Sequence, residues 1–305
     1  MHARVLRTPE ERFDNLEGYS FKPNYLEVDG GELGPLRMHY VDEGDNNAPV
    51  ILCMHGEPTW SYLYRKMIPP LVEAGFRVVA PDLIGFGKSD KPALRNTYTQ
   101  ASHLGWMAQF IQQLDLTGIT LVCQDWGGLL GLRLGVQMPE RFARFTISNS
   151  GIVAGKAVGV GGNSFPFAIL DWIQYSQNVV DFDAGLVVEQ HTVNDLSQGA
   201  VAAYRAPFPS EEYKAGARQF PCLLTISPSH PEAAPATVDW EKFKVTEKPV
   251  LCAFGYHDPF FASVMMQIMQ IPGAQGQPHK MLNAAHFSQE DAGEEWAQMV
   301  IDWIG

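Results

Sequence analysis

The sequence predicts an α/β protein with an open, mostly parallel sheet covered by helices. Short apolar runs bounded by turn residues are typical of strands buried on both faces of such a sheet, and residues 36–42 alternate as a half-buried strand does. Helical patterns fill the segments between the runs, and this alternation favours right-handed crossovers. The predicted strands are residues 36–42, 50–54, 77–80, 119–123, 142–147 and 250–254, and the predicted helices are residues 62–73, 100–114, 128–137, 262–269 and 290–304.

Composition restricts the possible functions. The chain of 305 residues is 46% apolar and carries 22 Lys and Arg against 34 Asp and Glu, for a net charge of −12. The apolar content excludes a disordered chain, and the negative charge argues against a nucleic-acid partner. No apolar run is long enough to span a membrane, and the first residues lack the apolar segment of a signal peptide. We therefore expect a soluble, cytoplasmic protein without a membrane partner, whose four cysteines are reduced.

The alternation of strands and helices stops after Gly151 and resumes near Val250. The segment between them is rich in Gly, Pro and aromatic residues and contains no clear strand. We predict that residues 1–151 and 232–305 form the α/β core and that residues 152–231 are an inserted helical cap. Ligands of such sheets bind at the carboxyl ends of the strands, which places the site between core and cap.

The strongest local motif surrounds Asp125. A buried strand runs into Cys123-Gln-Asp125-Trp-Gly127 and then into a helix, which is the small-x-nucleophile-x-small pattern of a nucleophile elbow. Asp125 occupies the position of the nucleophile. The alternative is that Asp125 only caps the helix that follows it.

Two partners follow in the order that this fold requires, an acid and then a histidine. Asp258 comes just after one buried strand and His286 just after another. The segment Thr146-Ile-Ser-Asn-Ser150 contains no carboxylate, which leaves Asp258 as the orienting acid. His257, the neighbour of Asp258, is a weaker alternative for the base.

A third turn follows the strand at residues 50–54, in the sequence His55-Gly-Glu57-Pro58-Thr-Trp60. A His-Gly-x-Pro turn at a strand end supplies a backbone N–H to an oxyanion hole, together with the N–H of the residue after the nucleophile. The predicted donors are the amides of Glu57 and Trp126. We expect His55 to have a structural role and no catalytic one.

These motifs resemble those of the haloalkane dehalogenases, and the resemblance spans nearly the whole chain. It implies an α/β-hydrolase core with a mostly parallel eight-stranded sheet and an inserted helical cap. The family's nucleophile, acid and base correspond to Asp125, Asp258 and His286, and its first halide-binding tryptophan corresponds to Trp126. The stretches that carry the resemblance are residues 55–60, 82–92, 124–128, 204–209 and 285–287.

The resemblance is strongest to the branch of the family that binds halide with two tryptophans. The second of these lies in the cap, where Trp172 is the best counterpart. The other main branch has Asn where Glu57 stands and an acid after the earlier strand, and this chain has neither.

The chemistry of these residues suits displacement at a saturated carbon. An ionised Asp needs no base to attack it, and the product is an alkyl ester. Indole N–H groups stabilise the leaving halide, and His286, oriented by Asp258, activates the water that hydrolyses the ester. We expect a small haloalkane as substrate, a halide ion as ligand, no metal and no organic cofactor.

Other expectations concern the surroundings of the site. We expect a monomer, with a dimer as the alternative. Arg65, Lys66 and Arg133 are expected to be solvated helix charges. The aromatic residues of the cap that are expected to line the pocket are Phe165, Phe167, Tyr175 and Phe208.

Three alternative functions remain. An epoxide hydrolase shares the Asp elbow and would use cap tyrosines, for which Tyr175, Tyr204 and Tyr213 are candidates. A fluoroacetate dehalogenase carries Arg directly after the nucleophile, where this chain has Trp126. A ligand receptor on the same fold would not need a complete triad.

Overall fold

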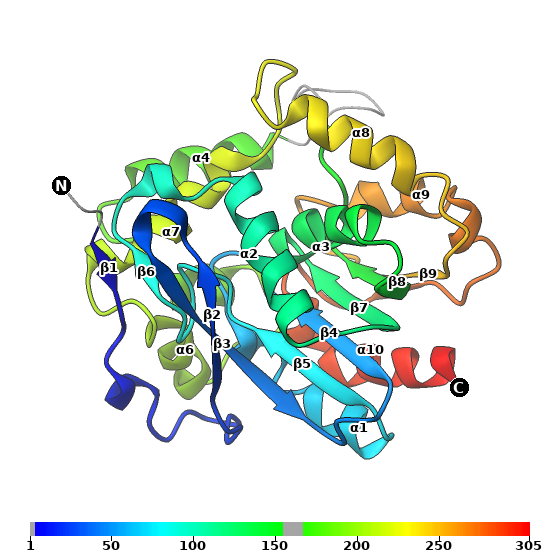
Figure 1. Ribbon diagram of the computed structural model, residues 1–305, viewed down its shortest axis with the longest axis horizontal. Coiled ribbons are helices and arrows are strands. Elements are labelled where there is room, and N and C mark those ends of the chain that lie inside the picture. Colours follow the sequence, from blue (N-terminus) through cyan, green and yellow to red (C-terminus); the bar gives the residue numbers. More distant parts are fainter. Residues whose placement is uncertain (1–3, 155–166) are drawn as a thin grey trace.

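The computed structural model describes residues 4–154 and 167–305 and contains a twisted sheet covered by helices (Figure 1). Eight strands form this sheet in the order β10-β9-β8-β7-β4-β5-β3-β2. Neighbours from β10 to β5 are parallel, whereas β5 with β3 and β3 with β2 are antiparallel. The prediction of a mostly parallel eight-stranded sheet is therefore confirmed. The strands are β2 (Asn24–Asp29), β3 (Pro35–Glu43), β4 (Val50–Met54), β5 (Arg77–Pro81), β7 (Ile119–Gln124), β8 (Phe142–Ser148), β9 (Val250–Gly255) and β10 (Lys280–Leu282), and a separate ribbon pairs β1 (Val5–Leu6) with β6 (Lys91–Pro92).

Helices pack against both faces of the sheet. On one face α3 contacts β4, β7 and β8, and α2 and α8 pack against α3; on the other face α1 and α10 pack together. Between β8 and β9 the chain leaves the sheet and forms α4 to α7 before α8 returns to it (Figure 1). The helices are α1 (Ile68–Glu73), α2 (Gln100–Gln113), α3 (Trp126–Gln137), α4 (Ala168–Asn178), α5 (Ala184–Gln190), α6 (Gln198–Arg205), α7 (Ala215–Gln219), α8 (Ala233–Phe243), α9 (Met265–Ile268) and α10 (Ser288–Ile304).

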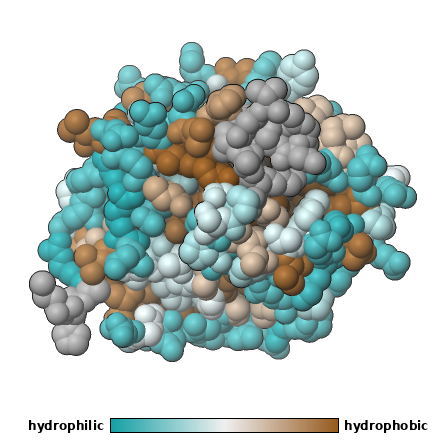
Figure 2. Space-filling view, turned by 90° about the horizontal axis from the view of Figure 1, so that it is seen from above, coloured by the Kyte–Doolittle hydropathy of each residue, from teal (hydrophilic) through white to brown (hydrophobic). Residues whose placement is uncertain are grey.

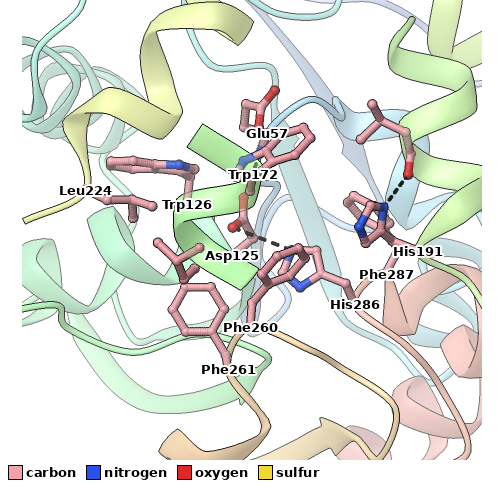
Figure 3. A pocket seen from close by; sticks show the side chains of 12 residues that line it. Glu57, Asp125, Trp126, Trp172, His191, Leu224, Phe260, Phe261, His286 and Phe287 are labelled. Atoms are coloured by element: carbon pink, nitrogen blue, oxygen red, sulfur yellow. Dashed lines mark hydrogen bonds and ion pairs between the residues drawn. The ribbon is translucent and has the colours of Figure 1, made fainter. Parts of the chain in front are cut away.

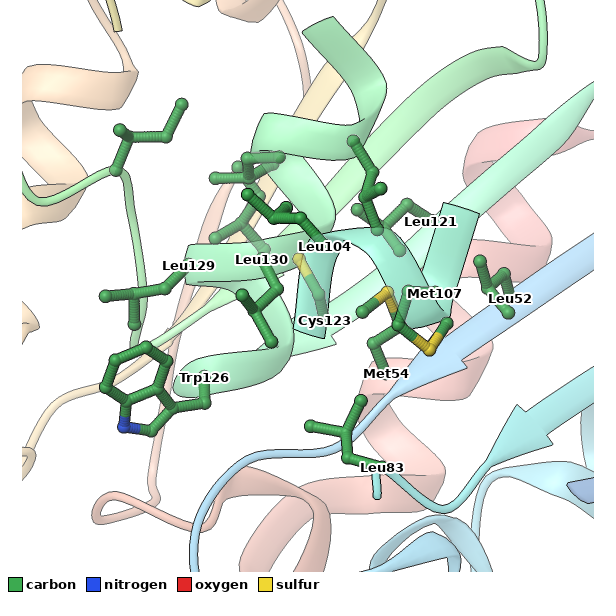
Figure 4. Close-up of a cluster of buried hydrophobic side chains, with 14 of the residues drawn as sticks. Leu52, Met54, Leu83, Leu104, Met107, Leu121, Cys123, Trp126, Leu129 and Leu130 are labelled. Carbon is green, nitrogen blue, oxygen red and sulfur yellow. The ribbon is translucent and has the colours of Figure 1, made fainter. Parts of the chain in front are cut away.

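The central strands are buried along their whole length, which explains their continuous apolar sequences. Every residue of β4, β7 and β9 is buried. Figure 4 shows the core on the α3 side, where Leu121 and Met54 of the sheet meet Leu130 of α3 and Met107 of α2. Trp126 lies at the edge of the same cluster, so the residue after the elbow is anchored in the core.

Two predicted helices are shorter than expected. Residues 62–73 contain a 3₁₀ turn, Ser61–Tyr64, and the helix proper begins only at Ile68. Pro69 and Pro70 explain this start, because proline lacks the N–H that a preceding turn would need and is tolerated in the first turn of a helix. Residues 262–269 form a 3₁₀ turn followed by the short helix α9.

The prediction that Arg65 and Arg133 are solvated charges is wrong. Arg65 is 8% exposed and donates to both carboxylate oxygens of Glu290, and Arg133 is 3% exposed and pairs with Asp239 at 2.7 Å. Burial of a guanidinium requires such a partner, which a sequence pattern does not reveal. Lys66 is partly exposed and donates to the Glu290 carbonyl at 2.6 Å.

The face that carries α4 and α8 mixes apolar and polar side chains (Figure 2). Apolar groups gather near the middle of this view. Phe167, which precedes α4, and Leu170 within it are exposed apolar residues. Within residues 4–154 and 167–305, no helix is long and apolar enough to cross a membrane.

The contact between α3 and the sheet generates a prediction about Gly127. A Cβ at Gly127 would lie 1.9 Å from the Met54 carbonyl oxygen, which is a backbone atom, so relief of the clash requires a shift of the main chain. We expect Gly127→Ala to lower the free energy of unfolding by about 3 kcal/mol or more, measured by urea denaturation. Gly105→Ala in α2, where a Cβ meets nothing within 4 Å, is the matched control and should be neutral or slightly stabilising. Equal stability of the two variants would contradict this account of the elbow.

Candidate active site

Asp125 occupies a strained turn between β7 and α3. Its backbone has φ 50° and ψ −129°, a region that residues with a side chain rarely adopt. The side chain makes no capping hydrogen bond to α3, so the alternative of a simple helix cap is not supported. The Ser150 hydroxyl donates to the Asp125 carbonyl at 2.6 Å and helps to hold the turn. The carboxylate is therefore directed away from the helix and into the site.

Glycines allow other parts of the chain to approach this turn. A Cβ at Gly56 would lie 2.2 Å from Asp125 Oδ1, and one at Gly128 would lie 2.2 Å from Ser150 Oγ. Side chains at these positions would displace the carboxylate or the residue that supports it. The two sequence motifs that contain Gly56 and Gly128 thus meet at a single point.

The two oxygens of Asp125 have different surroundings. The Glu57 amide donates to Oδ1 at 2.8 Å, whereas Oδ2 lies 3.5 Å from His286 Nε2. Oδ1 is thus held by the predicted oxyanion donor, and Oδ2 faces the base. The Trp126 amide directly follows Asp125, and its role as the second donor stays a prediction.

His286 and Asp258 come together from the ends of β10 and β9. His286 Nδ1 lies 2.9 Å from Asp258 Oδ1, and the amides of Phe260 and Phe261 donate to the two carboxylate oxygens of Asp258 at 3.1 and 2.7 Å. Asp258 is buried, whereas the neighbouring His257 is exposed. The geometry therefore favours His286 over His257 as the base.

Two amide side chains, which the sequence did not single out, hold the backbone of His286. Gln124 and Asn149 donate to its carbonyl oxygen at 3.0 and 2.9 Å. Asn149 also accepts from the Gly255 amide at 2.9 Å and so ties the end of β8 to the end of β9. It follows β8, in the segment where the sequence contains no carboxylate.

Burial and neighbouring charges have opposite effects on His286. Burial disfavours the charged ring, but the carboxylates of Asp258 and Asp125 outweigh it and raise the pKa of His286 to about 9. The stabilisation of the fold by this ion cluster is therefore complete below the ordinary histidine pKa of 6.5 and is lost as the pH rises through about 9. Loss of the charge on Asp125 would remove one of the two carboxylates that raise the pKa of His286.

Trp126 of α3 and Trp172 of α4 face the same pocket as Asp125 (Figure 3). In this view their indole nitrogens point toward each other across the space beside the carboxylate. In the described part of the chain neither indole N–H has an acceptor, whereas Trp60 and Trp296 donate to the Ala203 carbonyl and the Thr146 hydroxyl. The remaining lining residues of this inner pocket are Glu57, Ile169, Val187, His191, Leu224, Phe260, Phe261, His286 and Phe287.

The predicted pocket aromatics are placed differently. Phe167 is 58% exposed, and Phe208 packs against Phe86 and lines a separate cavity with Asp183 and Lys214, so neither forms the wall of the inner pocket. Tyr175 stacks on Trp172 and lines an outer cavity, and Phe165 lies outside the described residues.

Several lining residues were missed in the sequence. Phe260, Phe261 and Phe287 lie within three residues after Asp258 or His286 in the chain, and this proximity is the signal that could have found them. His191 is isolated in the segment between β8 and β9 and has no such signal. The tyrosines that an epoxide hydrolase would need are not in the inner pocket: Tyr175 lies in the outer cavity, and Tyr204 is buried with its hydroxyl bonded to Glu290.

The described residues contain no group of three or more His, Cys, Asp or Glu side chains that could hold a metal ion. The apolar walls and the carboxylate–imidazole–carboxylate arrangement indicate covalent catalysis on a small, largely apolar substrate.

Comparison with known proteins identifies a matching family and similar chains. Residues 49–293 match the model of the alpha/beta hydrolase fold family. The chain is 46% identical to a haloalkane dehalogenase of Psychrobacter cryohalolentis, over 99% of this chain and 98% of that protein, and 44% identical to one of Mycolicibacterium paratuberculosis, over 98% of each. It also resembles the solved tetrameric haloalkane dehalogenase DpaA of Paraglaciecola agarilytica NO2, with 37% identity, 97% of each chain covered and a TM-score of 0.87.

The surroundings of Glu57 generate a prediction about its protonation. Burial, and after it the charge of the nearby Asp125, raises the pKa of Glu57 well above its ordinary value of 4.5, so the folded protein favours the neutral carboxyl. We expect Glu57→Gln, a neutral side chain of the same shape, to change kcat less than about fivefold, which is about 1 kcal/mol in the barrier. The thermal stability of the parent should fall relative to that of the variant as the pH rises above 4.5, because only the parent must keep a proton bound. Glu57→Asp, which keeps the carboxyl on a shorter side chain, is the control. A large loss of kcat in folded Glu57→Gln, with kcat retained in Glu57→Asp, would contradict this prediction and show that the ionised carboxyl is needed.

Proposed function

This chain belongs to the haloalkane dehalogenases of the alpha/beta hydrolase fold, and we propose that it cleaves the carbon–halogen bond through an alkyl ester on Asp125. The enzyme is a hydrolase acting on carbon–halide bonds. The observation that supports the covalent route most strongly is the division of labour between the two oxygens of Asp125. Oδ1 accepts from the Glu57 amide, and Oδ2 remains for attack on the side of His286.

In the first step Asp125 Oδ2 attacks the carbon that bears the halogen. The carbon–halogen bond breaks, and its electron pair leaves with the halide toward the indole N–H groups of Trp126 and Trp172. The halide can accept a hydrogen bond from both indole N–H groups, because no described residue accepts from either of them. The product of this step is a neutral ester of Asp125.

Formation of the ester prepares the second step. The charge of Asp125 is one cause of the raised pKa of His286, and esterification removes that charge. The pKa of His286 therefore falls, and the ring gives up its proton to solvent. The neutral Nε2 then takes a proton from water, whose oxygen attacks the carbonyl carbon of the ester. The negative charge develops on Oδ1 beside the Glu57 amide, and we assign the second stabilising N–H to Trp126. Collapse of the intermediate releases the alcohol and restores the carboxylate, while Asp258 stabilises the imidazolium.

We assign residues 152–231 to a cap domain and residues 1–151 and 232–305 to the core. Trp172 and His191 come from the cap segment, whereas Asp125, Asp258 and His286 come from the core, which supports a site between the two. We propose a location in the cytoplasm. The expected assembly remains a monomer with a dimer as the alternative, and the tetramer described for the DpaA relative adds a third state for solution measurements to distinguish.

The covalent route predicts a trapped intermediate. Because His286 serves only the hydrolysis of the ester, His286→Phe should react once with 1-bromobutane, release one equivalent of halide and stop. Mass spectrometry of the variant should find one butyl group on a peptide that contains Asp125. Asp125→Asn, with deamidation excluded, is the control and should release no halide.

The same assay tests the function as a whole. The parent enzyme should release bromide from 1-bromobutane or 1,2-dibromoethane in repeated turnovers and form little diol from styrene oxide. An unmodified His286→Phe protein that binds substrate would contradict the assignment of roles. Diol formation without halide release would contradict dehalogenation itself.

The two indole donors lead to a prediction about halide affinity. Trp172→Phe keeps most of the aromatic volume and removes one donor to a charged ligand, which contributes about 1.5–3 kcal/mol. We expect bromide, titrated by quenching of tryptophan fluorescence, to bind roughly tenfold or more weakly. Trp303→Phe is the control, because Trp303 donates to Gln277 at 2.7 Å and does not line the inner pocket. Bromide affinity equal to that of the parent in Trp172→Phe would mean that another residue is the second donor.

A further inference from the structure

Each hydrolytic turnover leaves one proton on His286, and the structure encloses that proton. The His286 side chain is 6% exposed, and the rings of Phe260, Phe261 and Phe287 lie against it. Apolar walls cannot carry a proton. The imidazolium must nevertheless lose it before the ring can act as a base again, and a titratable group between the pocket and solvent would provide a route for it.

Four titratable side chains line the inner pocket: Glu57, Asp125, His191 and His286. Beside this pocket lies the outer cavity of about 260 Å³, and the two share four lining residues: Trp172, Val187, His191 and Phe260. Of the four titratable groups of the described inner wall, His191 is thus the one that also reaches the outer cavity. Glu57 lines the inner pocket alone.

The contacts of His191 leave one ring nitrogen available. Nδ1 lies 2.8 Å from the Val187 carbonyl, which can only accept, so Nδ1 carries a hydrogen. In the neutral ring Nε2 is then the acceptor, and no described residue occupies it. Figure 3 shows this second nitrogen turned toward the side of the pocket where His286 lies. The two imidazoles lie against the same ring of Phe260, at centroid distances of 5.4 and 5.1 Å.

We propose that His191 is the proton outlet of the active site, an inference that rests on the proposed function. Once Asp125 is an ester and the pKa of His286 has fallen, the proton leaves His286 Nε2 and passes through water in the pocket to His191 Nε2. It is then released from that nitrogen into the outer cavity, where buffer takes it up. No bond other than N–H and O–H forms or breaks. His191 returns to the neutral ring with its hydrogen on Nδ1.

The charges around His191 suit a transient carrier. Burial lowers its pKa, its bond to the Val187 carbonyl raises it, His286 lowers it and Asp258 raises it, and the result is a pKa below the ordinary value. From α4, Asp171 and Tyr175 line the outer cavity, and from α10, Asp291 accepts from the amides of Val193 and Asn194. The ring is therefore neutral when a proton arrives, and a carboxylate lies on the outward side.

The test measures how turnover depends on buffer. His191→Phe keeps a ring against Phe260 but cannot carry a proton. In weak buffer at neutral pH, we expect its kcat for 1-bromobutane to fall roughly tenfold or more, and added imidazole buffer to restore most of it. The rapid first release of halide, which reports alkylation, should be unchanged. His191→Gln should behave in the same way and serves if the Phe variant does not fold. His230→Gln, which removes a histidine that lines neither cavity, is the control.

The outcomes separate the outlet from other roles. A variant that turns over as fast as the parent in weak buffer would overturn the outlet. So would a slow variant that imidazole does not rescue, because loss of packing or of substrate binding does not respond to a proton carrier. Failure of the parent to release halide would instead overturn the proposed function, and the two failures are therefore distinguishable.

Discussion

The conformation of Asp125 is the constraint on which the rest of the site depends. A left-handed residue between a buried strand and a helix costs of order 1–3 kcal/mol and persists only where its surroundings over-determine it. Here three glycines permit the approach of the β4 turn, the β4 carbonyl and Ser150, and the Ser150 hydroxyl and the Glu57 amide bind the residue from two sides. The same contacts that stabilise the strained turn also place the Glu57 amide beside Oδ1 of Asp125.

His286 shows how one arrangement can serve two steps with opposite needs. During alkylation its positive charge would be balanced by Asp125 and Asp258, and during hydrolysis it must accept a proton. Burial and the two carboxylates have opposing effects on its pKa, so removal of one carboxylate charge is a large change in this balance. Because the proposed reaction removes the charge of Asp125, the pKa of His286 falls after alkylation, and the ring gives up its proton more readily at the stage when water is the next reactant.

Much of the core could be predicted from the sequence, because buried parallel strands have continuous apolar sequences and their carboxyl ends meet at one edge. This logic located Asp125, Asp258, His286 and the Glu57 turn. It failed where partners distant in the chain decide the outcome: the guanidiniums of Arg65 and Arg133 are buried by carboxylates more than 100 residues away. For a related reason the sequence placed Phe208 in the pocket and missed His191. Helix packing in the proposed cap, rather than a periodic sequence pattern, decides which side chains face the pocket.

In the proposed site, one halide donor is fixed in the core and the position of the other depends on the proposed cap. Trp126 begins α3 and is anchored in the core, whereas Trp172 lies on α4 among Tyr175, Phe182 and His191. A hydrogen bond to halide weakens steeply with distance and angle, so the packing of α4 determines whether both indoles act together. The cap is tied to the core through Tyr204 of α6, whose hydroxyl joins the buried Arg65–Glu290 pair. We therefore expect substitutions that loosen this buried contact to weaken the proposed halide binding by Trp172 more than they disturb Asp125. The described contacts of Asp125 are with Glu57, Ser150 and His286 of the core.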